Sequence, residues 1–194
     1  MFVSTPKSLS FRHFLSTLAA LLMLGFAMAG GAVAEQKCAA AAFVKSAGQA
    51  YDRAASSGSA SAFASAAARY SDLRSLSLFA LGRYRKDLPK SREAEYLKLT
   101  RQFIGQTLKT HGSGFQGANL TITDCKQSGG NLVVTARTSG GTKVIFRLAR
   151  AGGGYTVKDV NMKGVWLVQQ MRSTFVGTIS RTGSIDGLFR YLGS

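Results

Sequence analysis

Few residues in this 194-residue sequence have the types and spacing that catalysis requires. A hydrolase needs a nucleophile beside a base. The only histidine after position 34, His111, stands in a glycine-rich segment, and no G-x-S-x-G motif occurs. Beyond Asp124 the only acidic residues are Asp159 and Asp186, which fit helix caps or turns better than an acid–base pair. The sequence therefore predicts a protein that is not an enzyme.

The two cysteines, Cys38 and Cys125, do not have the spacing of metal ligands. A single histidine after position 34 is too few to complete a metal site with them. In an oxidising compartment, two cysteines can form a single intramolecular bridge that closes a long loop. We expect this disulfide; two buried thiols are the alternative. We expect neither a metal ion nor a cofactor.

The N-terminal segment is typical of an export signal. Lys7 and Arg12 provide its positive start, and an uncharged apolar run follows until Ala32-Val33-Ala34 supplies small residues for cleavage. We expect residues 1–34 to be a cleaved signal peptide and residues 35–194 to form one domain. The alternative is an uncleaved anchor, because about 20 uncharged residues can span a bilayer.

The chain is strongly basic, with 25 Lys and Arg against 9 Asp and Glu. Removing Lys7 and Arg12 lowers the formal net charge of +16 by only two. Such an excess favours contact with polyanions or anionic lipid headgroups, or it serves solubility alone. Export and the absence of zinc-finger spacing argue against nucleic acid as a partner.

Helical periodicity marks both ends of the mature chain. Alanine-rich helices are expected over residues 35–57 and 62–69, and an amphipathic helix over 91–110 after Pro89. The apolar run 73–82 fits a buried helix or a strand. The stripe that starts at Val165 predicts a long helix to about residue 181, followed by a short helix over 185–192.

Between these helices the apolar period changes from 3.6 to 2. Segments around 120–126, 131–137, 143–148 and 155–162 alternate like strands, and glycine-rich turns of hairpin length join them. Four consecutive strands predict an antiparallel meander with one face covered by helices. The expected class is α+β: N-terminal helices, a four-stranded sheet and C-terminal helices.

Three ordered stretches match the motifs of one family. Residues 78–97 (LFALGRYRKDLPKSREAEYL) match L-G-x-Y followed by a Pro-started helix, residues 155–168 (YTVKDVNMKGVWLV) match Y-x-[VA]-x-D-x-x-x-x-G-V-S-[LM], and residues 181–188 (RTGSIDGL) match a closing G-[GS]-[IL]-D-G-L. Together they resemble the MlaC family of periplasmic phospholipid-binding proteins, also called toluene-tolerance proteins. The similarity runs from about Tyr70 to Leu192. Trp166 departs from the pattern, which has a small serine there, and we expect it to reshape the pocket mouth.

This resemblance implies a carrier with a curved, nuclear-transport-factor-like sheet and helices that enclose an apolar pocket. Family members carry glycerophospholipid through the periplasm between an outer-membrane lipoprotein complex and an inner-membrane ABC transporter with an MCE-domain subunit. Some related proteins are associated with hopanoid synthesis, so another polar lipid, such as a hopanoid, is the alternative ligand.

Apolar side chains on the predicted elements would form the walls of such a pocket, with ordinary core as the alternative for each one. The candidate lipid-binding residues are Phe79, Tyr96, Phe103, Ile104, Val134, Val144, Phe146, Val165, Val168, Met171 and Phe175.

Basic residues crowd the middle of the chain, where they would form a headgroup or partner surface or simply a solvated helix face. They are Arg83, Arg85, Lys86, Lys90 and Arg92. The alternative function is an exported cationic module that binds polyanions or anionic membrane surfaces without an internal lipid pocket.

Overall fold

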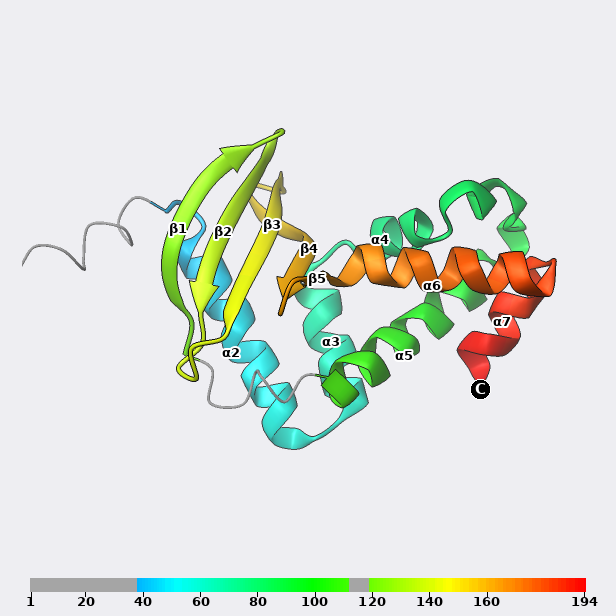
Figure 1. Cartoon of the computed structure of the whole chain (residues 1–194), viewed down its shortest axis with the longest axis horizontal. Coiled ribbons are helices and arrows are strands. Elements are labelled where there is room, and N and C mark those ends of the chain that lie inside the picture. Colours follow the sequence, from blue (N-terminus) through cyan, green and yellow to red (C-terminus); the bar gives the residue numbers. More distant parts are fainter. Residues whose placement is uncertain (1–37, 112–118) are drawn as a thin grey trace, which may run out of the picture. The chain divides into compact units, whose positions relative to one another are not determined.

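The computed structural model describes residues 38–111 and 119–194. The predicted signal peptide lies outside these residues. Within them the fold is α+β, as predicted: helices precede and follow the strands of an antiparallel sheet along the sequence (Figure 1). No helix in the described ranges is both long and apolar enough to cross a membrane.

Two alanine-rich helices begin the domain: α2 (Ala41–Ser57) and α3 (Ala60–Tyr70). Gly58 separates them in the left-handed backbone region, at φ 62°, and the Ser59 side chain caps α3 by accepting a hydrogen bond from the Ala62 N–H. Small side chains let α3 approach α5 (Glu93–His111) closely. A Cβ added at Gly105 of α5 would lie 2.4 Å from the Ala60 carbonyl oxygen.

The sheet contains five strands in sequence order, one more than predicted. They are β1 (Thr121–Ser128), β2 (Asn131–Arg137), β3 (Lys143–Ala151), β4 (Gly154–Met162) and β5 (Val165–Trp166). The extra strand occupies the positions predicted as the start of the long helix. A tight turn at Lys163 and Gly164, both with positive φ, folds Val165 back onto Met162.

One face of the sheet packs on α2, which lies across it in Figure 1. The alternating residues Leu132, Val134 and Ala136 are buried there against Val44 and Ala47 of α2. This burial follows the period of two in the sequence, because side chains alternate between the faces of a strand. It forms a first hydrophobic core, which we call the sheet core.

The remaining helices build a second core. They are α4 (Leu73–Ala80), the 3₁₀ turns η1 (Gly82–Asp87) and η2 (Lys90–Arg92), α5 (Glu93–His111), α6 (Leu167–Thr182) and α7 (Ile185–Gly193). The ambiguous run 73–82 is therefore a helix with a 3₁₀ extension. Tyr96, Phe175 and Leu188 are fully buried among these helices. We call this cluster the helical core.

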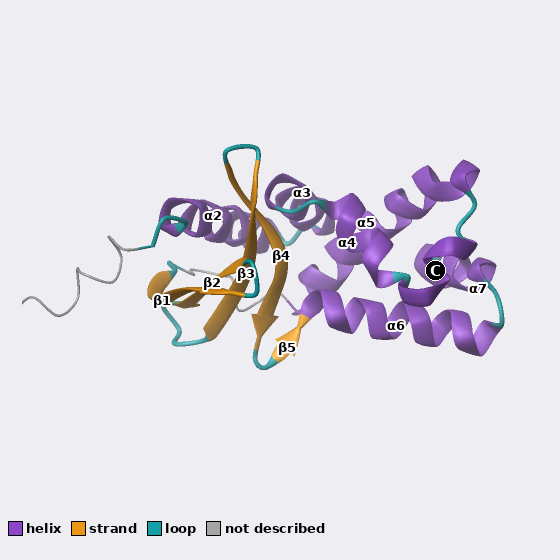
Figure 2. Ribbon diagram, turned by 90° about the horizontal axis from the view of Figure 1, so that it is seen from above, coloured by secondary structure: helices purple, strands orange, loops and turns teal. Residues whose placement is uncertain are grey.

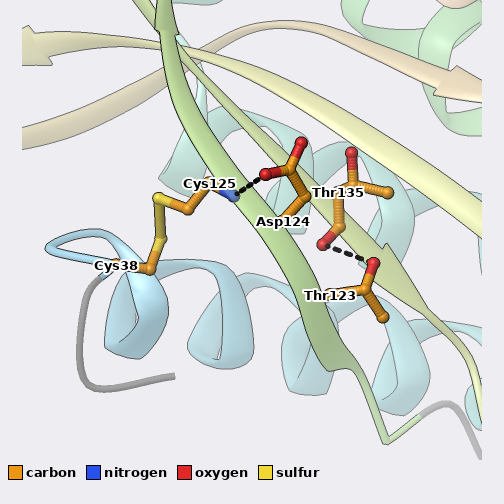
Figure 3. Close-up of a disulfide and its surroundings, with 5 residues drawn as sticks. All are labelled: Cys38, Thr123, Asp124, Cys125 and Thr135. Carbon is orange, nitrogen blue, oxygen red and sulfur yellow. Dashed lines mark hydrogen bonds between the residues drawn. A yellow bond between two sulfur atoms is a disulfide. The ribbon is translucent and has the colours of Figure 1, made fainter. Parts of the chain in front are cut away.

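The predicted disulfide between Cys38 and Cys125 is present. It links the residues just before α2 to β1, as Figure 3 shows, with a Cα–Cα distance of 5.6 Å. On β1, the Cys125 N–H donates to the Asp124 carboxylate at 2.9 Å, and the Thr123 hydroxyl donates to the Thr135 carbonyl on β2 at 3.3 Å. The bridge thus fixes the start of α2 to the outermost strand.

Replacing both cysteines with alanine should destabilise the domain. The bridge closes a loop with a sequence separation of 87, and the loss of that constraint corresponds to about 4–5 kcal/mol in the chain-entropy model. Urea unfolding of the wild type and of Cys38→Ala/Cys125→Ala measures the difference. A reducing agent should lower the stability of the wild type alone. Equal stability of the two proteins would contradict the prediction.

Candidate functional site

A cavity of about 360 Å³ lies where the sheet core and the helical core meet. Its walls come from α2, from the end of α3, from α4, α5 and α6, from β3 and β4, and from α7. The lining residues are Tyr51, Ala67, Ser71, Leu73, Leu76, Phe103, Ile104, Thr107, Leu108, His111, Phe146, Val157, Asp159, Val160, Leu167, Val168, Gln170, Met171, Thr174 and Tyr191.

The lining is mainly apolar and comes from opposite sides. Phe146 and Val157 project from the sheet core, and Met171 projects from the helical core. The polar lining residues are Ser71, Thr107, His111, Asp159, Gln170 and Thr174, and among the described residues no lysine or arginine lines the cavity. Such a site favours an apolar ligand over an anionic group.

Helix α6 forms one wall, and a carboxylate from the sheet fixes its first turn. Trp166 precedes the helix without a side-chain capping bond. Asp159 of β4 supplies that cap instead, because its carboxylate accepts hydrogen bonds from the Val168 N–H at 2.9 Å and the Val160 N–H at 2.8 Å. Negative charge at a helix N-terminus is favourable. Figure 2 shows the short strand β5 leading directly into α6.

Asp159 is only 3% exposed. Burial raises the pKa of its carboxyl group, since the charged form loses hydration, while the backbone N–H groups and the nearby Arg147 act in the opposite direction. The burial effect is the largest. The cavity wall therefore contains a carboxyl group that is protonated more readily than an ordinary aspartate.

Trp166 lies beside the cavity and does not line it. The Arg147 guanidinium lies over its indole ring, 4.3 Å from the centroid, a cation–π arrangement. In the strand register, Arg147 of β3 lies opposite Asp159 of β4, and Trp166 of β5 lies opposite Asn161 of β4. The tryptophan thus packs on the sheet surface where β5 meets α6.

Five of the predicted wall residues lie together in this cavity: Phe103, Ile104, Phe146, Val168 and Met171. The other six lie elsewhere. Tyr96 and Phe175 are buried in the helical core, and Val134 and Val144 in the sheet core. Phe79 and Val165 are 42% and 46% exposed.

Several lining residues were not predicted, although the apolar spacing in the sequence indicates them. On α5, Thr107, Leu108 and His111 continue the stripe that Phe103 and Ile104 begin, at the spacing of one helix face. On α4, Leu73 and Leu76 belong to the apolar run that remained ambiguous between helix and strand. Polar lining such as Gln170 and Thr174 carries no such signal.

The predicted basic surface lies outside the cavity, on η1 and η2. Arg83, Arg85, Lys86 and Lys90 are exposed. Arg92 is held in place by ion pairs with Glu95, at 3.0 Å, and with Asp186 at the start of α7, and it lies over the Phe189 ring at 3.6 Å. Arg92 therefore joins η2 to α7.

The protein-family model for the MlaC protein matches residues 39–194, which is nearly the whole described domain. The chain belongs to the MlaC family. The predicted resemblance is thereby confirmed, and the match extends N-terminally beyond Tyr70, over α2 and α3.

Among solved structures, the phospholipid-binding protein from Ralstonia solanacearum, in complex with a phospholipid, has a similar fold. The TM-score is 0.66 at 17% sequence identity, with coverage of 78% of this chain and 93% of that chain. This likeness confirms the α+β fold of the MlaC chain. A search of curated proteins finds no match.

The position of Asp159 predicts a specific pH dependence. Because its pKa is higher in the folded than in the unfolded protein, its contribution to stability is complete below about pH 4, the ordinary carboxyl pKa, and is lost as the pH rises through the folded pKa. The free energy of unfolding of the wild type relative to Asp159→Asn should therefore fall as the pH rises from about 4. Urea unfolding at several pH values measures this difference.

Asp72→Asn is the matched control, because the hydrogen bonds from Ser75 lower the pKa of Asp72 in the folded protein. Its contribution is present above the ordinary pKa and is lost as the pH falls through the lowered one. The wild type should therefore lose stability relative to Asp72→Asn on acidification. A difference for Asp159→Asn that is constant or rises with pH would show that its buried carboxylate is not disfavoured.

Proposed function

We propose that this MlaC-family protein is a periplasmic phospholipid-binding carrier. The observation that carries the proposal is the apolar cavity between the two cores, in a chain of this family and with the fold of a phospholipid-bound protein. Its volume of about 360 Å³ falls in the range of about 300–1,000 Å³ typical of small-molecule sites.

The energetics suit a carrier better than a tight receptor. Burying one methylene contributes about 0.8 kcal/mol, so an acyl chain of about 15 methylenes gains roughly 12 kcal/mol relative to water. A bilayer offers about the same gain. For the acyl chain, the cavity therefore approaches parity with the membrane, and parity permits both loading and release.

The wider transport system is part of the same proposal. We infer that residues 1–34 direct export and are removed, so that the domain works in the periplasm. It would exchange glycerophospholipid, or another polar lipid such as a hopanoid, with an outer-membrane lipoprotein complex and with an inner-membrane ABC transporter that has an MCE-domain subunit. The exposed Arg83, Arg85, Lys86 and Lys90 are candidates for a headgroup or partner surface. We infer binding rather than catalysis.

Mass spectrometry of an organic extract tests the proposal. Protein purified from the periplasm without detergent should release phospholipid in stoichiometric amounts. Extracts without lipid would overturn the carrier proposal. They would favour the cationic-module alternative, which is based on the formal net charge of +16. Binding of a polyanion to the surface should weaken steeply with salt.

A charge inside the cavity should prevent loading. Val168→Glu places a carboxylate in the apolar wall on α6, where burying an unpaired charge is very unfavourable. We expect loading of a fluorescent phospholipid from vesicles to fall at least about tenfold. Ser173→Glu adds the same charge to an exposed position of α6 outside the lining, and should load like the wild type. Equal loading by both variants would remove α6 from the binding site.

A further inference from the structure

A second hollow, of about 800 Å³, lies between α3, α5 and α7. Its floor includes Ala64, Leu99 and Leu192, and its rim carries Lys98, Arg101 and Gln102 of α5. We call it the α5–α7 groove. The proposed acyl-chain cavity and this groove use different faces of α5.

The groove adjoins the cavity through one aromatic pair. Phe103 and Tyr191 line both hollows, and their ring centroids are 6.0 Å apart. Phe103 also packs edge-on against the buried Phe175 at 5.3 Å, whereas Tyr191 is 40% exposed. The two hollows therefore adjoin at these two rings, one of which, Tyr191, is exposed.

The charges of the two hollows differ. Lysine and arginine are absent from the described lining of the cavity, whereas Lys98 and Arg101 stand one helical turn apart on the rim of the groove. Arg101 is oriented toward α3 by a hydrogen bond from its guanidinium to the Ser65 hydroxyl at 3.3 Å. Neither cation forms an ion pair with a described residue, and no acidic side chain of the described chain lines the groove.

We propose that the α5–α7 groove binds the phosphate of a lipid whose acyl chain occupies the cavity. The lipid would pass beside Tyr191, and Lys98 and Arg101 would hold its phosphate by charge-assisted hydrogen bonds. This assignment rests on the proposed function. It adds the site that recognises the headgroup, and it makes the phosphate, rather than the group esterified to it, the recognised feature.

A competition between two lipids with the same acyl chains tests this site. Mixed vesicles contain phosphatidylcholine, which has a phosphate but no net charge, and diacylglycerol, which has no phosphate. Mass spectrometry gives the ratio of the two lipids loaded on the protein. For Lys98→Gln/Arg101→Gln, the ratio of phosphatidylcholine to diacylglycerol should fall roughly fivefold from the wild-type value, as expected for two exposed ion pairs.

Lys109→Gln/Lys143→Gln is the matched control, because it removes two exposed charges that line neither hollow. Its loaded ratio should equal that of the wild type. An unchanged ratio in Lys98→Gln/Arg101→Gln would overturn the groove assignment while leaving the carrier function intact. A wild type that loads neither lipid would instead overturn the carrier function itself.

Glycerol 3-phosphate separates a lipid phosphate from a free phosphate ester. It carries the phosphate without the chains, so an excess should leave the loaded ratio of the wild type unchanged. If it lowers the ratio to that of Lys98→Gln/Arg101→Gln, the groove is a site for soluble phosphate esters and the assignment to lipid is wrong.

Discussion

The two hydrophobic cores of this protein meet without merging, and a buried carboxylate fixes the helix that spans their junction. Asp159 belongs to the sheet, yet it caps the first turn of α6 through the Val168 N–H. The same helix then buries Phe175 in the helical core and presents Met171 to the cavity. If α6 were free to settle on the sheet, apolar burial would favour closing the gap. The cap fixes the start of the helix and so helps to keep the space open.

This arrangement gives a physical basis for the carrier proposal. A packed domain has few voids larger than a water molecule, so an apolar cavity of about 360 Å³ leaves stabilising contacts unmade. The disulfide between Cys38 and Cys125 and the separate sheet and helical cores stabilise the domain around it. A ligand that fills the cavity would restore the missing contacts, while its polar end would remain near the cations of the α5–α7 groove.

Much of the fold could be predicted from the sequence, because each element carries its own period. Val144, Phe146 and Leu148 alternate and are buried in β3 as expected. The fifth strand was missed because two residues, Val165 and Trp166, are too few to show alternation and merge with the helical stripe that follows. Pairing with Asn161 and Met162, which is a tertiary contact, decides their conformation.

The cavity was harder to predict than the fold. Met171 and Phe175 are one turn apart on the same apolar stripe, yet the first lines the cavity and the second is core. Periodicity identifies the buried face of a helix, but it does not show which residues of that face line the cavity and which pack into the core. Asp159 was predicted as a cap or turn former, but which helix it caps was not predicted, because the carboxylate of β4 reaches α6 across the turn and β5 instead of from the position before the helix. The family resemblance therefore predicted that a pocket exists, and the structure was needed to locate it.

The most direct test is a crystal structure of the protein loaded with a phospholipid that carries bromine on an acyl chain. The account predicts anomalous bromine density inside the cavity, among Phe103, Phe146 and Met171. Density confined to the protein surface, in crystals that contain the bound lipid, would contradict the claim that the gap between the two cores is the lipid-binding site.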